Sequence, residues 1–411
     1  MSFFASGIFF RGFSVFFLPV RDSLALTNAQ TALVFSVARA EGGLGGPWAG
    51  WLIDRFGNRL LVVVGVILSA IGYFLFARVV HGFWSFALVY LGVISFGSSI
   101  AFQHAMFAGF NNWFRRRRSL TMSILAAISS LGGLVLVPLV SLMVLHLGWQ
   151  WAAFAAGLTY LIGILPMTLI LRNRPEDMGL LPDGDATPPV LAPTGRGGPS
   201  GRAAELRDYT VKEAMRTQAY WLLLLGAGLR QLATLGILVN IVPILVAKGA
   251  GKQEAANLLG LMFGINIVSR LALGYLADKW SKSRILMVTL ALEGTAFLCL
   301  FYGSWSGLGI ILFLIFILLE AMGDGAGVLI WAALGEYYGR DRFATLRGMI
   351  TFSHSWVQIA VPVFTGWVFD QTDSYSWAIG PAVIFAGLSS LSFMLVKKPP
   401  QLTKAPAEVA A

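Results

Sequence analysis

The stretch that decides the fold reads GWLIDRFGNR and occupies residues 50–59. A second version, GYLADKWSKSR, occupies residues 274–284, which is 224 residues further along a chain of 411. Each copy ends one long apolar run and is followed by another. Both copies place an aspartate four residues after a glycine, at Asp54 and at Asp278. The repeat predicts that one helical unit has been duplicated, with the same charged turn in each half.

The composition indicates a membrane protein. Hydrophobic residues make up 57% of the chain and charged residues 12%, whereas a soluble domain carries roughly 25% charged residues. The charges lie in short clusters between apolar stretches of about 18 residues or more, the length that a bilayer span needs. We therefore expect an all-α fold with twelve transmembrane helices in two pseudo-symmetric six-helix bundles. The expected spans are residues 3–20, 28–53, 60–79, 83–110, 119–145, 150–171, 218–246, 255–277, 285–303, 307–334, 346–369 and 376–396.

One long polar segment divides the chain into two halves. Residues 172–216 are rich in Pro, Gly, Arg and Asp, which is typical of a linker. The prediction is a first bundle over residues 1–171, a cytoplasmic linker with a short interfacial helix within residues 208–216, a second bundle over 217–396 and a cytoplasmic tail over 397–411. The first span is short: either it crosses the membrane with little spare length, or an N-terminal extension is missing, and we favour the second explanation.

The net charge of +10 could suggest a nucleic-acid partner, but the placement of the charges argues against one. With both termini inside, the inner loops (Arg347 counted among them), the linker and the tail hold 22 of the 30 lysines and arginines, and the outer loops hold four. This is the positive-inside pattern. We expect a multi-pass protein of the cell (inner) membrane, embedded in the lipid bilayer, with cytoplasmic termini.

The sequence offers no sign of an enzyme or a cofactor. Cys299 is the only cysteine, so neither a disulfide nor a cysteine metal site can form. Histidines and acids lack metal-ligand spacing, and no glycine-rich loop could cradle a phosphate, so we expect no metal, no cofactor and no use of ATP.

The repeated turn predicts a gate between helices. Glycines recur every four residues before the first copy, at Gly42, Gly46 and Gly50, and their small size lets a neighbouring helix approach closely. Charges of opposite sign at a helix end can grip a neighbouring helix terminus in one conformational state and release it in another. The alternative is an ordinary topology signal, which two equivalent copies make harder to accept. The expected gating residues are Asp54, Arg55 and Arg59, and Asp278, Lys279 and Arg284.

These two turns resemble the signature loops of the major facilitator superfamily, and the resemblance covers nearly the whole chain. Three further stretches resemble its monocarboxylate transporter and oxalate–formate exchanger branch: residues 112–120 (NWFRRRRSL), the pair Gly132–Gly133 with Pro138, and residues 174–184 (RPEDMGLLPDG). The resemblance implies a transporter in which two bundles rock around a central site.

Several charged residues fall inside the expected spans: Arg11, Arg39, Arg230 and Arg270, and Glu41, Glu293, Glu320 and Asp324. An unpaired arginine at the centre of a span costs roughly 2.5–3.5 kcal/mol, so most of them must be paired, hydrated or waiting for an anionic ligand. Glu320 and Asp324 are four residues apart and share a helix face. We expect them to pair with Arg39 or Arg230, in a structural, gating or coupling role; Glu293 has no evident partner.

Arg270 is the main candidate for a binding residue. Asn266, Arg270 and Gly274 recur every four residues and form one stripe, and a guanidinium matches a carboxylate with two parallel hydrogen bonds. The resemblance implies that Arg270 stands where the branch binds the substrate carboxylate, while Asn266 replaces an acid. A buried ion pair is the alternative.

Arg11 aligns with a lysine of the family's first helix. That lysine is thought to exchange a proton with the acid that Asn266 replaces, but an arginine does not deprotonate and an asparagine does not titrate. We therefore expect two fixed positive charges without a titrating partner, which favours a dianion or anion exchange. The alternative for Arg11 is a side chain that extends to the membrane interface.

His104 and His354 also lie within spans. Each could line the cavity and carry a proton near neutral pH, or be merely hydrogen-bonded. The expected function is a carrier of small organic anions, mono- or dicarboxylates of the lactate, pyruvate, oxalate or formate type, by symport with protons or by anion exchange. The alternatives are an exporter of drugs or other amphiphilic compounds, with a wide apolar cavity, and a non-transporting sensor that signals through residues 172–216.

Overall fold

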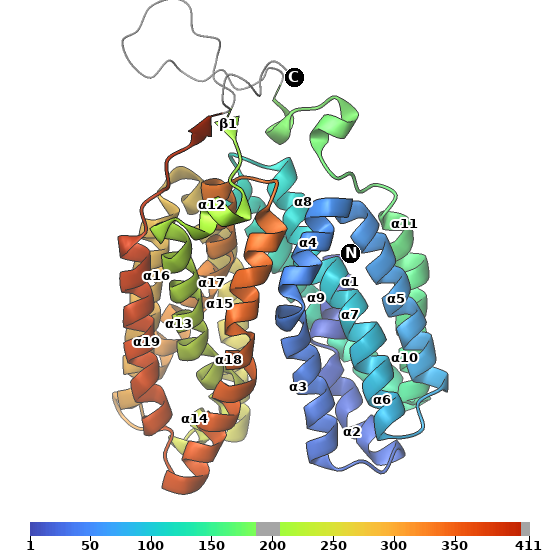
Figure 1. Cartoon of the computed structure of the whole chain (residues 1–411). Coiled ribbons are helices and arrows are strands. Elements are labelled where there is room, and N and C mark those ends of the chain that lie inside the picture. Colours follow the sequence, from blue (N-terminus) through green and yellow to red (C-terminus); the bar gives the residue numbers. More distant parts are fainter. Residues whose placement is uncertain (186–205, 404–411) are drawn as a thin grey trace, which may run out of the picture.

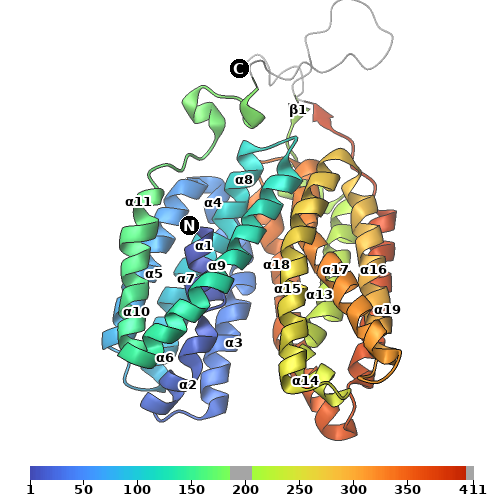
Figure 2. The ribbon, with the colours of Figure 1, turned by 180° about the vertical axis from the view of Figure 1, so that it is seen from behind.

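Two bundles of helices stand side by side and contact each other at one end (Figures 1 and 2). The structure is a computed structural model that describes residues 1–185 and 206–403. Helices before the linker form the first bundle and helices after it form the second, so the expected all-α, two-bundle architecture is confirmed. The exact unit boundaries at residues 171 and 217 stay predictions.

Six spans make up the first bundle, and several of them consist of more than one helical segment. In chain order they are α1 (Ser2–Ala5) with a π-helical turn Ser6–Phe10 and α2 (Phe13–Ser23); α3 (Asn28–Leu44) with α4 (Gly46–Phe56); α5 (Asn58–Arg78); α6 (Phe83–Val89), a π-helical turn Tyr90–Ser95, α7 (Phe96–Ser98), a π-helical turn Ser99–Ala105 and α8 (Met106–Trp113); α9 (Arg118–Leu147); and α10 (Trp149–Leu158), a π-helical turn Thr159–Ile164 and α11 (Leu165–Met167).

The second bundle has longer, more continuous helices. They are α13 (Gln218–Val239) with α14 (Ile241–Ala247), α15 (Lys252–Lys279), α16 (Lys282–Tyr302), α17 (Gly309–Tyr338), α18 (Phe343–Thr372) and α19 (Ser376–Leu395). Most bounds fall within a few residues of the expected spans.

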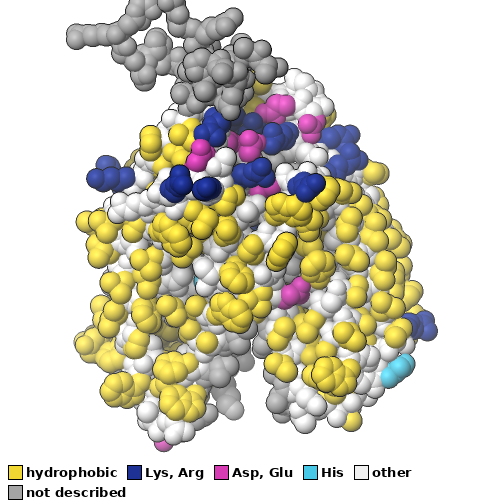
Figure 3. Space-filling view, in the orientation of Figure 1, with side chains coloured by type: hydrophobic (Ala, Val, Ile, Leu, Met, Phe, Trp, Pro, Cys, Tyr) yellow, Lys and Arg dark blue, Asp and Glu magenta, His cyan; other side chains and the backbone are white. Residues whose placement is uncertain are grey.

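Length and hydropathy identify most of these helices as membrane spans. Among the described residues, nine helices are long and apolar enough to cross a bilayer, and the bent pair Ser2–Phe10 with Val15–Ser23 would make a tenth. The two other expected spans correspond to α3 with α4 and to α18. Figure 3 agrees with a membrane setting: hydrophobic side chains cover the broad middle of the molecule, and Lys and Arg gather at the end where the linker lies.

Residues on either side of the undescribed linker stretch cover the end of the molecule that we call the linker end. They form two short 3₁₀ turns (Pro175–Met178 and Pro182–Gly184), the strand β1 (Leu206–Arg207), which pairs antiparallel with β2 (Leu402–Thr403), and α12 (Val211–Met215). The Thr210 side chain caps α12 and Glu213 completes the capping box. The short helix expected within residues 208–216 is therefore present.

Among the described residues, the hydrophobic core consists of two clusters of buried residues, and one of them extends from the first bundle into the second at the linker end. One cluster of buried residues runs through the first bundle and continues to Tyr338, Ala344 and Leu346 of the second, and another lies around Phe297 and Phe316 within the second bundle. At the opposite end the surface is indented between the bundles (Figure 3). The molecule is thus closed at the linker end and open at the other.

Candidate functional site

Two adjoining cavities lie between the bundles. The larger has a volume of about 710 Å³ and is lined by residues of both bundles, among them Arg11 and Phe263. The smaller, of about 270 Å³, is lined by Arg230, Arg270 and Arg347 among others. Because Gln103 and Gln358 line both cavities, the two spaces share a wall.

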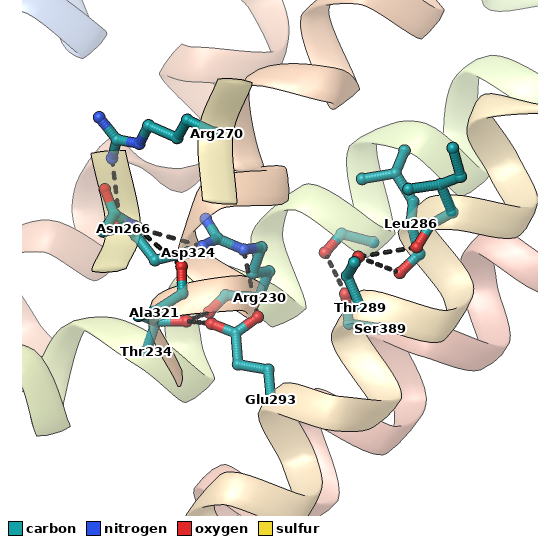
Figure 4. Close-up of polar contacts among 12 residues, drawn as sticks. Arg230, Thr234, Asn266, Arg270, Leu286, Thr289, Glu293, Ala321, Asp324 and Ser389 are labelled. Atoms are coloured by element: carbon teal, nitrogen blue, oxygen red, sulfur yellow. Dashed lines mark hydrogen bonds and ion pairs between the residues drawn. The ribbon is translucent and has the colours of Figure 1, made fainter. Parts of the chain in front are cut away.

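One carboxylate holds three side chains together beside the smaller cavity (Figure 4). Asp324 on α17 accepts hydrogen bonds from Arg270 Nη2 (2.9 Å) and Asn266 Nδ2 (2.9 Å), both on α15. Its other oxygen accepts from Arg230 Nη2 on α13 at 3.2 Å. Asp324 therefore neutralises part of the charge of two guanidiniums from different helices, of which Arg230 is buried and Arg270 half-buried.

This network corrects one expectation. The sequence predicted that Arg270 would have no titrating partner, but Asp324 is such a partner. On α15 the family's acid is replaced by Asn266. The acid that pairs with Arg270 is instead Asp324 on α17, 54 residues further along the chain. Sequence spacing along one helix cannot reveal it, because the contact depends on how two helices pack.

The second acid of the network is Glu293 on α16, for which the sequence had offered no partner. Arg230 Nε lies 3.4 Å from Glu293 Oε2, and the Thr234 hydroxyl donates to Glu293 Oε1 at 2.7 Å. The expected pairing of Asp324 with Arg230 is present. Glu320, by contrast, is 0% exposed and its carboxylate oxygens make no hydrogen bond within the described part of the chain. The side chain of Arg39 lies outside the described residues.

Two isosteric substitutions separate these buried acids. Glu293→Gln should lower the free energy of unfolding by about 2–4 kcal/mol, because Arg230 loses a charged partner in a dry site. Glu320→Gln should change it by less than about 1 kcal/mol, because it breaks no ion pair. Unfolding of the purified variants in detergent measures both. Equal losses in the two variants would contradict the assignment of Glu293 as the partner of Arg230.

Arg11 and Arg270 meet at one hydroxyl. Arg11 Nη2 donates to Ser130 Oγ at 3.2 Å, and Arg270 Nη1 donates to the same atom at 3.0 Å. Ser130 lies on α9 of the first bundle, so the contact joins guanidiniums from opposite bundles. Arg11 thus faces the interior and does not extend to a membrane interface. Ser130 was missed from the sequence, where serines within an apolar helix carry no distinctive signal.

The local fold explains how Arg11 gets there. The first span is broken at Arg11 and Gly12, between the π-helical turn Ser6–Phe10 and α2. π-Helical turns often occur at functional sites. The stem of Arg11 then crosses α9 at Gly133, where an added Cβ would overlap Arg11 Cδ. Gly133 therefore makes room for this arginine, while the adjacent Gly132 makes room for the backbone of Phe3.

Filling that space should displace the arginine without unfolding the protein. We expect Gly133→Ala to weaken anion binding about tenfold, because Arg11 must leave Ser130 while its flexible stem absorbs the overlap. Gly264→Ala on α15 is the matched control, since a Cβ there meets no atom within 4 Å. Binding titrations and melting curves of both variants test this. If the Gly133→Ala protein binds anions with wild-type affinity, the position of Arg11 beside Ser130 is not required for anion binding.

Arg347 is a site residue that the sequence misplaced. It was counted with the inner loops, but it is 4% exposed, lies on α18 and lines the smaller cavity. Its guanidinium is sandwiched between the rings of Phe107 (4.4 Å) and Trp331 (4.7 Å) and donates to the Gln103 carbonyl. A signal existed: polar residues recur at helical spacing along α18, namely Arg347, Thr351, His354 and Gln358.

The two histidines differ in their surroundings. His104 Nε2 lies 2.7 Å from the Gly42 carbonyl, and its Nδ1 lies 3.4 Å from Arg347 Nη1, so both ring nitrogens are engaged. His354 lines the smaller cavity, and its Nδ1 has no hydrogen-bond partner among the described residues. His354 is therefore the one better placed to meet a ligand.

The two repeated aspartates each cap a helix of the opposite bundle. Asp54, at the end of α4, accepts from the backbone N–H groups of Ala344 (3.3 Å) and Thr345 (2.9 Å) and from the Thr345 hydroxyl (2.6 Å), at the start of α18. Asp278, at the end of α15, accepts from the N–H groups of Ser119 (2.8 Å) and Leu120 (3.0 Å), at the start of α9. A helix N-terminus offers free N–H groups and a positive dipole end. We call these contacts the two aspartate caps.

The glycines before each aspartate allow this approach, but the basic residues after it do not take part. A Cβ on Gly50 would overlap the backbone of Ala344, and one on Gly274 would lie 2.5 Å from Ser123 Oγ. Arg55 instead lies over the ring of Trp51 (5.2 Å) and Lys279 over that of Tyr275 (4.3 Å). In this state the aspartates alone make the predicted contact with a neighbouring helix terminus, because the terminus itself supplies the positive partner; a gating role for Arg55 and Lys279 stays a prediction.

The remaining two predicted gating cations are Arg59 and Arg284. Arg284 is exposed, and the Arg59 backbone N–H donates to the Asn173 side chain at 2.9 Å.

The RPEDMGLLPDG stretch adds further contacts between the bundles at the linker end. Arg340 Nη2 donates to Glu176 at 2.8 Å, and Arg174 Nη2 donates to Asp341 at 2.7 Å. Partial burial of Glu176 would raise its pKa, but the Arg340 hydrogen bond and the nearby cations outweigh burial and hold the pKa below its ordinary value. Together with the aspartate caps, these pairs keep the linker end closed.

A two-bundle membrane fold with a charged site between the bundles, closed at one end and open at the other, is the architecture of an alternating-access transporter. The chain belongs to the Major Facilitator Superfamily, whose family model matches residues 1–362 and, in a second match, residues 223–411. It is a transporter rather than an enzyme.

Curated relatives match over most of their length. Monocarboxylate transporter 12-B of Danio rerio is 26% identical over 407 residues, which cover 94% of this chain and 83% of the relative. An uncharacterised MFS-type transporter of Bacillus subtilis, YcxA, is 24% identical over 402 residues, with 93% and 90% covered.

Solved structures share the fold. A single-residue variant of the fucose:proton symporter FucP of E. coli has a TM-score of 0.71 at 12% identity, with 97% of each chain covered. FucP in the outward conformation has a TM-score of 0.70 at 14% identity, again with 97% of each chain covered.

Proposed function

We propose that the protein carries small organic anions, mono- or dicarboxylates, across a cell membrane by alternating access. The observation that carries this proposal is the meeting of Arg11 and Arg270, from opposite bundles, at the Ser130 hydroxyl. The Ser130 hydroxyl is a neutral acceptor that brings the two guanidiniums to one point between the bundles. A carboxylate at this point would accept from both arginines in charge-assisted hydrogen bonds, which are roughly twice as strong as neutral ones.

An anion that binds Arg270 must compete with the carboxylate of Asp324. Arg270 is held by Asp324, which also keeps Arg230 and Asn266. An incoming carboxylate would take over the outward-facing N–H groups of Arg270, while Asp324 stays anchored by Arg230. The site then exchanges one anionic partner for another, without leaving a buried guanidinium unpaired at either stage.

The same geometry suggests how binding moves the bundles. An anion held by Arg11 of one bundle and Arg270 of the other draws the bundles together at the open end. Opening at the linker end then requires the two aspartate caps to break. The clustering of Lys and Arg at the linker end supports a cytoplasmic location for that end, with both termini inside, so this state would be open to the outside.

The driving ion depends on which groups titrate. Asp324 and His354 both lie at the site, so proton symport and anion exchange are both compatible with this geometry. Fixed charges on Arg11 and Arg270 favour exchange, whereas protonation of Asp324 on release from Arg270 would favour symport.

Uptake of labelled lactate, pyruvate, oxalate or formate into proteoliposomes tests the proposal. At least one of these anions should accumulate well above protein-free liposomes. Stimulation by preloaded unlabelled anion would assign exchange, and stimulation by an inward proton gradient would assign symport. If no carboxylate enters faster than into protein-free liposomes under either condition, the proposal fails.

A second candidate is an exporter of drugs or other amphiphilic compounds. The observation that favours it is the larger cavity, which is wide and lined mainly by apolar side chains, many of them aromatic. The arginines and acids between the bundles argue for an anionic cargo instead. Resistance conferred by overexpression to uncharged or cationic drugs would support the exporter.

A further inference from the structure

We infer that the cargo is a carboxylate with an aromatic body, whose ring occupies the larger cavity while its carboxylate meets Arg11 and Arg270. This inference rests on the proposed carrier function and narrows its substrate class. It starts from the contrast between the two adjoining cavities: the smaller is lined by three arginines, and the larger by one arginine among many aromatic rings.

The aromatic lining is continuous on the side of the first bundle. Phe13 and Phe35 have ring centroids 5.4 Å apart, Phe35 and Tyr90 4.9 Å, and Phe9 and Tyr90 6.1 Å. All four rings line the larger cavity. They come from three separate spans, so packing of the bundle, and not one local motif, builds this wall. Phe9, Phe35 and Tyr90 are buried against one another and form a rigid wall, whereas Phe13 is half-buried and keeps ring surface that a further ring can pack against.

The second bundle contributes a ring with free surface. Phe263 on α15 is 48% exposed and lines the larger cavity. Its ring lies 5.9 Å from the guanidinium carbon of Arg11. Arg270 is two turns along the same helix. A ligand ring beside Phe263 would therefore have its carboxylate near the arginines.

Size supports the same ligand. Sites for drug-sized molecules measure about 300–1,000 Å³, and the larger cavity of about 710 Å³ falls in this range. A one- to three-carbon acid would leave most of this cavity, and the exposed ring surface of Phe263, to water. That surface gains stability when an apolar group covers it. Closure of the bundles would shrink the cavity, but Phe9, Phe35 and Tyr90 are fixed within the first bundle and would remain its wall.

Direct binding to the purified protein tests the inference, with acetate, phenylacetate and phenylacetamide as probes. Phenylacetate should bind at least about tenfold more tightly than acetate, because the added ring is buried against apolar surface. Phenylacetamide has the same ring without the charge and should bind at least about tenfold more weakly than phenylacetate. Competition against labelled phenylacetate gives all three affinities.

The outcomes separate this inference from the carrier proposal. If acetate and phenylacetate bind equally, the aromatic body is wrong while the anion site stands. If phenylacetamide binds as well as phenylacetate, or if none of the probes binds, the anion site itself is wrong and the inference falls with it.

A pair of variants gives an independent arm. Phe263→Ala should weaken phenylacetate binding about tenfold and leave acetate within about twofold, because only the ring loses its contact. Phe364→Ala is the control, since Phe364 is also exposed and packs against Trp367 on α18. Equal losses for acetate and phenylacetate in the Phe263→Ala protein would overturn the placement of the ring.

Discussion

The Arg270→Gln protein should bind and transport carboxylates at least about thirtyfold less well than the wild type, although it still folds. Truncating one partner of a buried, hydrogen-bonded charge pair costs about 2–5 kcal/mol in binding, or roughly 30- to several-thousand-fold. In the proposed complex Arg270 supplies the bidentate contact to the anion. The variant keeps its fold because Asp324 retains Arg230 and Asn266 as partners. Anion affinity and initial transport rates in proteoliposomes measure the loss.

Two controls define what this loss means. Arg270→Lys should recover part of the affinity, because an ammonium keeps the charge but not the paired hydrogen bonds. Arg78→Gln removes a cation from the ring faces of Trp151 and Phe154, far along the chain from the site, and should leave transport unchanged. An Arg270→Gln protein with normal affinity and a normal melting curve would rule out Arg270 as the anion-binding residue.

The second large effect concerns the two aspartate caps. Each cap holds at least two backbone N–H groups with a carboxylate, and a hydrogen bond to a charged group contributes about 1.5–3 kcal/mol. Reversing a 99:1 equilibrium takes about 5.5 kcal/mol, which is the order of the two caps together. The Asp54→Asn/Asp278→Asn protein should therefore open at the linker end for a large share of the time.

Distances between spin labels can measure this shift. In a Cys299→Ala background, labels at Arg55 on the first bundle and Arg284 on the second report on the linker end, because both positions are exposed. The double variant should show a second, longer distance, and each single variant a smaller fraction of it. Asp22→Asn is the control, since Asp22 is exposed and pairs with its neighbour Arg21 on the same helix. An unchanged short distance in the double variant would contradict the gating role of the caps.

The repeat and the hydropathy pattern predict the fold well because both act locally. Each span needs only a run of apolar residues, and the glycine-to-aspartate spacing of residues 50–54 and 274–278 places the carboxylate at a helix end. What the aspartates contact could not be predicted in full. Each aspartate binds backbone N–H groups at the N-terminus of a helix in the other bundle, α18 for Asp54 and α9 for Asp278. The adjacent Arg55 and Lys279 had suggested that a side-chain cation would share in this contact.

The site itself was predicted only where a charge stands out against apolar neighbours. Arg11 and Arg270 could be recognised in this way, and they do converge. Arg347 was counted with the inner loops although it falls just inside the expected span of residues 346–369, because a predicted span boundary is uncertain by a few residues. Ser130 and the pairing of Asp324 with Arg270 depend on packing between helices, which no pattern along one helix encodes.

The two copies of the opening motif are thus alike in their gates and different in their chemistry. Beyond Gly50, α4 approaches α18 through glycines. Beyond Gly274, the same face of α15 carries Arg270 and Asn266 toward Asp324. Helix α15 therefore connects the aspartate cap at Asp278 to the proposed binding site at Arg270 over about two turns. Anion binding at Arg270 and release of the cap at Asp278 can be coupled through this one helix.

Equilibrium binding of lactate and of lactamide to the purified wild-type protein tests the central claim most directly. The two probes have nearly the same size and share the 2-hydroxyl group; lactate carries a negatively charged carboxylate where lactamide has a neutral amide. The account predicts that lactate binds at least about tenfold more tightly, because the arginines at Ser130 recognise charge. Equal binding of acid and amide, or tighter binding of the amide, would show that the site between the bundles does not select an anion.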